Sequence, residues 1–393
     1  MSLQVLSSTE QLAAADLLVV GAGIVGLAHA LEAARRGMSV LVLERDRRAL
    51  GASVRNFGHV IVSAMAPGRP FECALDARER WLWLGRTAGV PVSEAGTLFV
   101  ARHADELAVL EEAAAAAAER GLRLLSRDEV GRLAALPLDA VVGGAVAELD
   151  LRVDPRSAVA RLAAWLEERC DVRFVWDAAV LDVDLPVVTT SAGRIRAEQA
   201  IVCPGGDFTS LFRDAFADRP NLVLTKLQML RAAAPPGRSY GPTLATGLSL
   251  LHYPGFSGQP SVERLRARIE RERPELLAAR VNLLVAQLPG SDLVIGDTHE
   301  YGLAVSPFRS ERLDRLILSE AEALLGVALE VRERWYGVYP SAPGDPFMVV
   351  EPAPGVRLVE VVSGVGMTTA LGLAGRVMDG LLAAPSIAPA AEL

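Results

Sequence analysis

The stretch Asp16-Leu-Leu-Val-Val-Gly21-Ala-Gly23-Ile-Val-Gly26 decides the fold of this chain. Its apolar run predicts a buried strand that ends at Gly21, and a helix is expected over 27–36. Residues 39–44 then predict a second buried strand. A strand, a turn, a helix and a strand within about 30 residues are typical of a parallel βαβ unit, so we expect a Rossmann-type α/β domain here.

The glycines of this stretch have the spacing of a dinucleotide-binding turn. Gly21 permits the tight turn, Gly23 lets a pyrophosphate approach the backbone, and Gly26 lets helix and strand pack closely. The N–H groups at the helix start would attract the phosphates. Glu44 ends the second strand, where a carboxylate can accept both ribose hydroxyls and would repel a 2′-phosphate. We expect FAD or NAD rather than NADP, and the alternative is a βαβ unit without a nucleotide.

Composition excludes several classes of protein. The chain has 393 residues, 51% of them hydrophobic, and a net charge of −8. This length favours two domains, and the absence of a basic stripe argues against nucleic acid as a partner. The cysteines are Cys73, Cys170 and Cys203, too far apart for a disulfide framework, and the histidines lack metal-ligand spacing. We expect no metal and a reducing cytoplasm.

One apolar stretch, residues 12–31, is about long enough to span a bilayer. It contains Asp16, His29 and the turn glycines, so we expect no membrane span. The residues before it carry no positive charge, which argues against a signal peptide. The arginine-rich composition, with Lys226 as the only lysine, indicates a GC-rich bacterial genome. We expect the tail after Pro385 to be disordered.

The segment Gly51-Ala-Ser53-Val-Arg55-Asn56-Phe-Gly58-His59 resembles the D-amino-acid oxidase/sarcosine oxidase (DAO) family of flavoenzymes. In that family such a segment wraps the pyrophosphate and the ribityl chain of FAD. Other resemblances cover most of the chain: an adenine-contacting strand at 174–183, a small-residue turn at 201–206 and a glycine-rich turn at 363–368. A helix that starts at the last turn would stabilise the anionic reduced flavin.

The resemblance implies a glutathione-reductase-like FAD-binding domain and a discontinuous α+β substrate domain built on an antiparallel sheet. We expect the first at 1–90, 150–220 and 330–393, and the second at 91–149 and 221–329. FAD is expected to be noncovalent, because Ser341 stands nearest to the position of the cysteine that attaches it in sarcosine oxidases. The expected cofactor-binding residues are Gly21, Gly23, Ile24, Val25, Gly26, Glu44, Arg45, Ser53, Arg55, Asn56, Gly58, Val180, Cys203, Gly205, Gly337, Gly364, Gly366, Met367 and Thr368.

Candidate catalytic and substrate residues are more ambiguous, since each also fits an ordinary structural role. Polar side chains near the flavin could keep an amine deprotonated, and a loop expected at 235–258 could carry binding groups. A guanidinium binds phosphonate or carboxylate in a bidentate manner. The candidate catalytic residues are His59, Tyr301 and Tyr339, and the candidate substrate-binding residues are His252, Tyr253, His299 and Arg309. At Tyr339 many amino-acid oxidases of the family carry an arginine for the substrate carboxylate.

The resemblance implies FAD-dependent oxidation of the C–N bond of a small amine to an imine, which water hydrolyses to a carbonyl product. Segments 52–58, 251–253, 296–302 and 335–339 also resemble a bacterial subfamily associated with aminophosphonate catabolism. The expected substrate is therefore a small anionic amine, such as an amino acid or a 2-aminoethylphosphonate derivative.

Several alternatives stay open. Oxygen is the expected electron acceptor of an oxidase, but no lysine is evident over the flavin, so a dehydrogenase with another acceptor remains. Gly296-Asp297 superficially matches the ribityl-binding pair of flavin hydroxylases, which leaves a monooxygenase as a weaker alternative. A flavoprotein subunit without catalysis is a further alternative. The oligomeric state, monomer or homodimer, is open.

Overall fold

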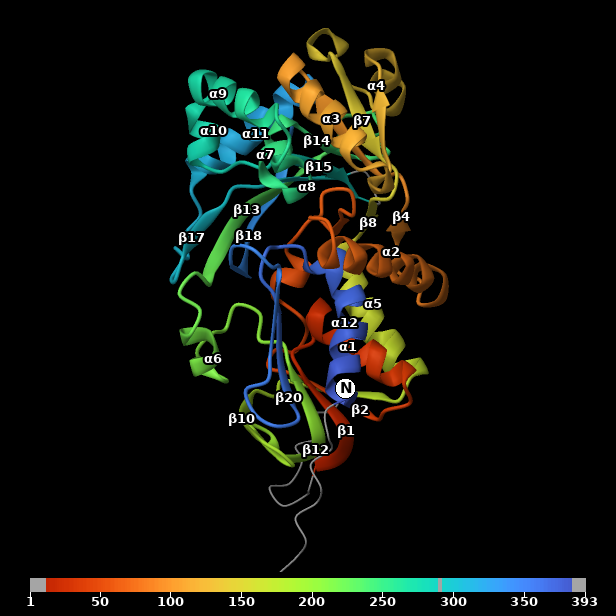
Figure 1. Ribbon diagram of the computed structural model, residues 1–393, viewed down its shortest axis with the longest axis vertical. Coiled ribbons are helices and arrows are strands. Elements are labelled where there is room, and N and C mark those ends of the chain that lie inside the picture. The colour runs from red at the N-terminus through yellow and green to blue at the C-terminus, as the bar shows by residue number, and fades with distance from the viewer. Residues whose placement is uncertain (1–11, 289–291, 384–393) are drawn as a thin grey trace, which may run out of the picture.

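The molecule contains two large sheets, each covered by helices, as Figure 1 shows. It is described by a computed structural model that covers residues 12–288 and 292–383. The tail after Pro385, which we expected to be disordered, lies outside the described residues, as does the segment before residue 12.

The N-terminal βαβ unit forms as predicted and lies at the centre of an eight-stranded sheet. Its strands are β1 (Leu12–Val20), β2 (Val40–Glu44), β9 (Val172–Trp176), β10 (Val180–Asp184), β11 (Val187–Thr190), β12 (Gly193–Val202), β19 (Phe347–Val350) and β20 (Val356–Val361). The order is β10-β11-β12-β1-β2-β9, with β20 beside β12 and β19 beside β20. β1 runs parallel to β2 and β12, and β12 runs parallel to β20, so the carboxyl ends of these strands share one edge.

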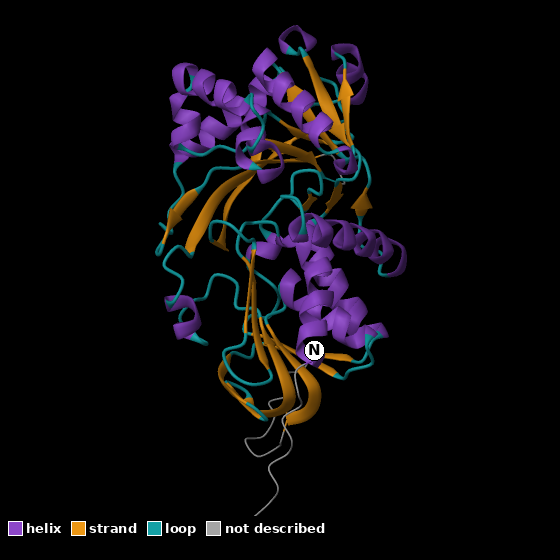
Figure 2. Cartoon of the chain, viewed as in Figure 1, coloured by secondary structure: helices purple, strands orange, loops and turns teal. Residues whose placement is uncertain are grey.

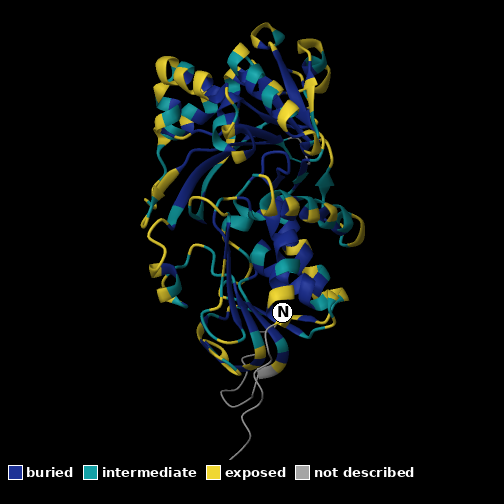
Figure 3. Ribbon diagram, viewed as in Figure 1, coloured by how far each residue is buried: buried dark blue, intermediate teal, exposed yellow. Residues whose placement is uncertain are grey.

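Strand β1 is buried on both faces, which is why its sequence is an almost continuous apolar run. Leu17 and Val19 point into one core and Leu18 into a second core on the opposite face, all with no exposed surface. The first core is covered by α1 (Ile24–Arg35), α2 (Arg69–Thr87), α5 (Pro155–Arg169) and α12 (Gly366–Ala383). Figure 3 shows that α1 and α12 are buried along most of their length, so the C-terminal helix completes the N-terminal domain.

The second sheet has nine strands and is largely antiparallel. Its strands are β5 (Thr97–Ala101), β6 (Leu122–Leu125), β7 (Gly143–Ala147), β13 (Val223–Ala233), β14 (Thr243–Ala245), β15 (Leu284–Gln287), β16 (Asp292–Gly296), β17 (Glu300–Gly302) and β18 (Val331–Ser341). Helices gather on the side of this sheet that faces away from the first domain (Figure 2): α3 (Ala104–Ala116), α4 (Arg127–Leu133), α7 (Gly247–His252), α8 (Pro254–Ser257), α9 (Val262–Glu272), α10 (Pro274–Ala278) and α11 (Glu311–Leu325). The expected mixed α/β fold, with one parallel and one antiparallel sheet, is confirmed.

A small sheet and one long strand connect the two parts. The small sheet has the order β3-β8-β4, from β3 (His59–Val60), β4 (Val92–Ser93) and β8 (Leu151–Val153). Strand β18 was expected in the FAD-binding part, but it pairs with β13 of the second sheet along most of its length. Its last residue bridges to Ser363 beside the first sheet. The other domain boundaries stay predictions.

The segment 235–258, expected to be a loop, is more ordered than its Pro and Gly content suggested. It contains β14, α7 and α8, because short elements between these residues bury apolar side chains such as Leu248 and Leu250. Pro254 occupies the first turn of α8, where its missing N–H costs nothing. The segment thereby presents the end of α7 to the space between the sheets. Among the described helices, none combines the length and the apolar character needed to cross a bilayer.

Candidate functional site

A cavity of about 480 Å³ runs from the first sheet to the space below the second sheet. The glycine turn after β1 and the glycine turn before α12 both line it, although more than 300 residues separate them in the chain. The parallel strands β1, β12 and β20 end at this edge of their sheet. Ligands of open α/β sheets bind at this carboxyl edge.

The first turn is shaped by glycines that no other residue could replace. Gly21 has a φ of +100°, and a side chain there would meet the carbonyl oxygen of Cys203. A Cβ at Gly26 would overlap the carbonyl oxygen of Gly21. Helix α1 begins directly after Gly23, which provides no side-chain cap; apart from the Ile24 N–H, which Ser53 accepts, the N–H groups of its first turn can meet an anion.

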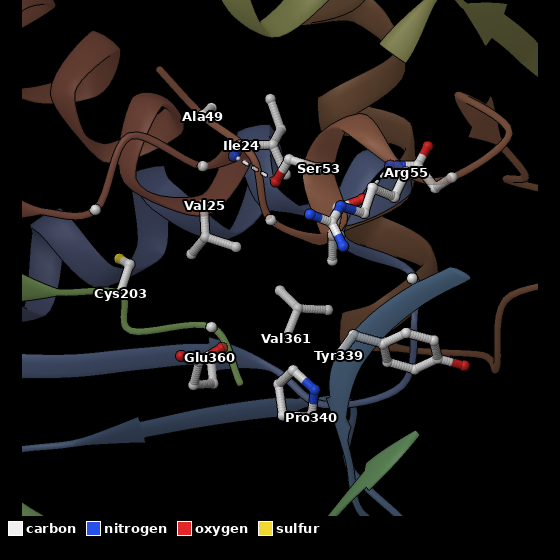
Figure 4. Close-up of a pocket in the computed structure, with 18 of the residues that line it drawn as sticks. Ile24, Val25, Ala49, Ser53, Arg55, Cys203, Tyr339, Pro340, Glu360 and Val361 are labelled. Atoms are coloured by element: carbon white, nitrogen blue, oxygen red, sulfur yellow. Dashed lines mark hydrogen bonds between the residues drawn. The ribbon is translucent and has the colours of Figure 1, made fainter. Parts of the chain in front are cut away.

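A second segment, residues 51–58, closes over this turn. The Ser53 hydroxyl accepts a hydrogen bond from the Ile24 N–H at 2.9 Å. Figure 4 shows this contact and the Arg55 guanidinium extending toward the same part of the cavity. No ion pair with Arg55 is found in the described part of the chain. A cation and a helix N-terminus therefore converge where a diphosphate is expected.

Two residues of this segment serve the loop itself. Asn56 donates from Nδ2 to the Ala52 carbonyl at 2.8 Å and accepts the Gly58 N–H at 2.6 Å. Gly58 does not line the cavity: it has a φ of +69° and packs against Val153, where a side chain would overlap the carbonyl oxygen. The structure therefore gives Gly58 a backbone role, because the chain turns toward β8 there.

Glu44 and its neighbours form the far end of the cavity. The Glu44 carboxylate accepts the Ala22 N–H at 2.9 Å and the Asp46 N–H at 3.1 Å, which fixes its orientation. Arg45 pairs with Asp207 at 3.1 Å. Val180, Cys203 and Gly205 line the same end, and burial raises the pKa of the Cys203 thiol. This end has the donors and acceptors that a nucleoside requires.

Of the four buried polar atoms on the wall of the cavity that lack a partner within the described ranges, two lie on β20 and in the turn after it. They are Oε1 of Glu360, at the end of β20, and Oγ of Ser363. Burial raises the pKa of the Glu360 carboxyl well above its usual range. Because an unpaired buried polar group is costly, these atoms indicate that a polar ligand occupies this stretch. Neither Glu360 nor Ser363 was expected as a site residue from the amino-acid sequence.

The opposite end of the cavity lies between the sheets and is lined by polar side chains, most of them titratable. They come from β3, α7, the segment before β15, the turn after β16, and β18, and they are His59, His252, Tyr253, Asn282, Asp297, His299 and Tyr339. Asn282 donates to the Tyr253 hydroxyl at 3.2 Å and accepts from Ser249 at 2.7 Å. The His252 ring lies 4.6 Å from the His299 ring, measured between centroids. Burial lowers the pKa of His252 to about 3, so this imidazole is neutral.

Asp297 and His299 form a pair within this group. His299 Nδ1 lies 2.9 Å from the Arg280 carbonyl oxygen and therefore donates to it. The other ring nitrogen, Nε2, lies 3.8 Å from Oδ1 of Asp297. Burial raises the pKa of the Asp297 carboxyl to about 6.

His59 belongs to a separate buried network. Its Nε2 lies 2.6 Å from the Thr97 hydroxyl, which in turn bonds to the Asp150 carboxylate. Since Thr97 donates to Asp150, His59 Nε2 carries the proton and Nδ1 is left as an acceptor. Burial and then Arg152 lower the pKa of His59 to about 3. Nδ1 has no partner in the region that the structure describes.

Two expected site residues lie elsewhere. Tyr301 does not line the cavity; it is 42% exposed and its ring lies under the Arg280 guanidinium, at 4.8 Å. Arg309 pairs with Asp314 of α11 and does not line the cavity either. The expectation that Arg309 holds an anionic substrate is therefore not supported, because its charge is already paired on another element.

The residues that the sequence analysis missed gave weak signals. Asn282 lies in a segment without any motif. Asp297 was considered only because Gly296-Asp297 matches the ribityl-binding pair of flavin hydroxylases. In the structure it follows an antiparallel strand and lies beside His299. The closeness of two titratable residues, separated by one position, could have indicated a shared site.

The remaining expected residues do line the cavity. Gly337 of β18 and the turn residues Gly364, Gly366, Met367 and Thr368 are on its wall. Gly364 has a φ of +74°, and a side chain there would meet the Tyr339 ring. The Thr368 hydroxyl accepts the Ile61 N–H at 3.1 Å, which ties the start of α12 to β3.

Comparisons with known proteins agree on the architecture. The model of the DAO family, described as FAD dependent oxidoreductase, matches residues 16–379. Glycine oxidase from Geobacillus kaustophilus has 18% identity and a TM-score of 0.74, with 94% of each chain covered. L-proline dehydrogenase from P. horikoshii has 15% identity and a TM-score of 0.75, with 93% of this chain and 92% of that chain covered.

A third solved structure is iminodiacetate oxidase from Chelativorans sp. BNC1, with 20% identity, a TM-score of 0.69, and 95% of this chain and 97% of that chain covered. At these identities the structural likeness shows the fold. No match was found among curated proteins.

Proposed function

Because this chain belongs to the DAO family of FAD-dependent oxidoreductases, we propose that it oxidises the C–N bond of a small amine to an imine, which water then hydrolyses to a carbonyl compound. The observation that carries the proposal is one continuous cavity, which has the glycine turn before α1 at one end and a buried set of imidazole, phenol and carboxyl groups at the other. Such a cavity can hold a dinucleotide and a small polar substrate in contact.

The residues present fit FAD. The first turn of α1 and Arg55 would hold the diphosphate, and Glu44 would accept the ribose hydroxyls. The unpartnered oxygens of Glu360 and Ser363 suit the hydroxyls of the ribityl chain. The N-terminus of α12 would face the flavin ring, where its partial positive charge favours an anion. When bound, FAD supplies the two-electron acceptor for the oxidation.

The side chains at the substrate end orient the amine and exclude water. Phe57, Leu227 and Leu284 are buried and provide apolar walls between the polar groups. His59 Nδ1 is available to accept a hydrogen bond from the substrate. Burial raises the pKa of Tyr339 well above its usual range, so its hydroxyl stays protonated and donates. Exclusion of water strengthens each of these contacts.

Among small amines, we propose an amino acid or an aminophosphonate such as a 2-aminoethylphosphonate derivative. Support for the aminophosphonate comes from the local sequence resemblances at 52–58, 251–253, 296–302 and 335–339. The donors available to its acid group are Tyr253 and His252, both neutral at physiological pH, because burial raises the pKa of the first and lowers that of the second.

A dehydrogenase that passes electrons to a non-oxygen acceptor is the second candidate. Lys226 is the only lysine, and it is buried away from the cavity, where it donates to the Phe308 carbonyl and pairs with Glu300 at 3.4 Å. The lysine that some relatives use to speed the reaction with oxygen therefore has no counterpart among the described lining residues.

A reduction screen tests the proposal. The FAD-loaded protein is mixed without oxygen with 2-aminoethylphosphonate, its hydroxylated and N-methylated forms, glycine, sarcosine and proline, and the visible flavin absorption is followed. A substrate amine is expected to bleach it, whereas ethylphosphonate, which lacks the amine, is not. Peroxide formed on admission of air would identify an oxidase. If dithionite bleaches the protein but no amine does, the proposal is wrong.

A further inference from the structure

We propose that Asp297 is the specificity-determining residue of the substrate end: its carboxylate pairs with the cationic amino group of the substrate and accepts one of its protons. This inference rests on the proposed amine oxidation and names the side chain that recognises the amine. It replaces the expectation that an arginine selects the substrate through its acid group.

The position of the Asp297 carboxylate is set by its backbone. The Asp297 N–H donates to the Asn282 carbonyl at 2.8 Å, and the Asn282 N–H donates to the Asp297 carbonyl at 2.9 Å. This reciprocal pair joins the end of β16 to the segment before β15. The residue is 4% exposed, yet it lines the cavity. The carboxylate is therefore buried in the protein and faces the ligand space.

Oδ1 of Asp297 has no hydrogen-bond partner in the described residues. A buried carboxylate oxygen without a partner is costly, and more so when the group is charged. Such a group on the wall of a ligand-sized cavity is a candidate for completion by a ligand. An ammonium group would supply both the missing charge and the missing donors.

Among the histidines and tyrosines around Asp297, His299 alone can offset its charge, and it does so only when it is protonated. His299 faces it at 3.8 Å from the same turn, and His252 lies behind His299 on α7. The phenols of Tyr253, Tyr301 and Tyr339 approach from the end of α7, from β17 and from β18. Burial raises the pKa of each phenol, and the charge of Asp297 raises it further. The Arg280 guanidinium lies over the Tyr301 ring at 4.8 Å and partly opposes the rise that burial causes in the pKa of that phenol.

No lysine or arginine lines this end of the cavity within the described ranges. The arginines on the cavity wall are Arg45 and Arg55, and both belong to the nucleotide end. Arg45 pairs with Asp207, and Arg55 extends toward Ser53 (Figure 4). The fixed charge that the substrate meets is therefore negative, which favours recognition of a cation.

The proton transfer balances without any further reactant. One N–H bond of the substrate ammonium breaks, one O–H bond forms on Asp297, and the electron pair of the broken bond stays on nitrogen as the lone pair of the neutral amine. No group is oxidised or reduced in this step. His299 Nε2, at 3.8 Å from Oδ1, is within reach to share the proton after a small movement. Because burial raises the pKa of Asp297 to about 6, its carboxylate is a stronger proton acceptor than an exposed one.

The test compares Asp297→Asn with Asp292→Asn in the FAD-loaded protein. Each change removes one carboxylate charge, Asp292 at the start of β16 and Asp297 directly after its end. Unlike Asp297, Asp292 pairs with Arg231 and does not line the cavity. Dissociation constants for 2-aminoethylphosphonate and ethylphosphonate are measured without oxygen, by rapid mixing, from the change in flavin absorption. The quantity of interest is the preference for the amine over its analogue without the amine.

We expect the wild type and Asp292→Asn to bind the amine about tenfold or more tightly than its analogue without the amine. In Asp297→Asn most or all of this preference should be lost. The rate of flavin reduction in Asp297→Asn should also rise with pH, as the fraction of neutral free amine increases. Asp297→Ser is a second neutral variant in case the asparagine variant does not retain FAD. An unchanged preference in the neutral variants, or no preference in the wild type, would overturn the inference.

The outcomes separate this inference from the proposed function. If amines bind with a preference that depends on Asp297 but none reduces the flavin, the oxidation is wrong and the recognition stands. If amines reduce the flavin and the preference is the same in Asp297→Asn, the recognition is wrong and the oxidation stands.

Discussion

Replacing Asp297 by asparagine should stabilise the protein at neutral pH, and the gain should disappear in acid. Asparagine has nearly the same shape as aspartate but carries no charge. The carboxylate of Asp297 is buried, and its Oδ1 lacks a partner in the described part of the molecule. The variant would therefore be more stable while losing the group that we propose recognises the substrate, as is common for buried charges at functional sites.

The magnitude follows from proton linkage. Burial raises the pKa of Asp297 from 3.8 to about 6, so between these values the folded state binds more protons than the unfolded state. The free energy of unfolding of the wild type must then fall as the pH rises through this window. About two pKa units at roughly 1.4 kcal/mol each give a penalty of roughly 3 kcal/mol above pH 6, and almost none below about pH 4.

The assay is urea unfolding of wild type and Asp297→Asn at about pH 4.5 and about pH 7.5, with FAD in excess so that cofactor binding contributes equally. The difference in unfolding free energy should grow by about 2 kcal/mol toward neutral pH, in favour of the variant. Asp292→Asn, which loses an ion pair with Arg231, should instead be less stable by up to about 1 kcal/mol at neutral pH. A difference for Asp297→Asn that does not change with pH would show that its charge is compensated in the folded state.

Two further predictions address the nucleotide turn and the His59 network. Gly26→Ala should abolish FAD binding and destabilise the fold by about 1 to 3 kcal/mol, because the added Cβ would overlap the Gly21 carbonyl oxygen. The control Gly51→Ala has open space around its Cβ and should retain stoichiometric flavin. Equal flavin content in the two variants would refute this prediction. Thr97→Val should slow anaerobic flavin reduction by about 10- to 100-fold with unchanged FAD content, because the hydroxyl that bonds His59 Nε2 is lost. An unchanged rate would mean that the position of the proton on His59 has no effect on flavin reduction.

The nucleotide end of the cavity was predictable because its requirements are local. The turn needs glycine at Gly21 and Gly26 for backbone reasons that the spacing alone reveals. Glu44 follows at the end of the next strand, at the distance that a βαβ unit imposes. Gly58 is the exception, because its backbone conformation serves the contact with β8 rather than the cavity.

The substrate end was only partly predictable. Of the candidate residues, His59, His252 and His299 line the cavity, whereas Tyr301 and Arg309 do not, and the roles of all five stay predictions. An arginine in the sequence indicates a positive charge but not the group that pairs with it. Arg309 pairs with Asp314, five residues later on α11.

The amino-acid sequence alone determined the parallel unit, its glycine turn and the acid that follows, because strand burial, backbone conformation and helix N-termini depend on neighbours in the chain. Only the tertiary structure decided which charges are paired and which stay open. Around Asp297, β16, α7 and β18 meet without placing a described lysine or arginine on this end of the cavity, and such burial depends on segments that lie far apart in sequence.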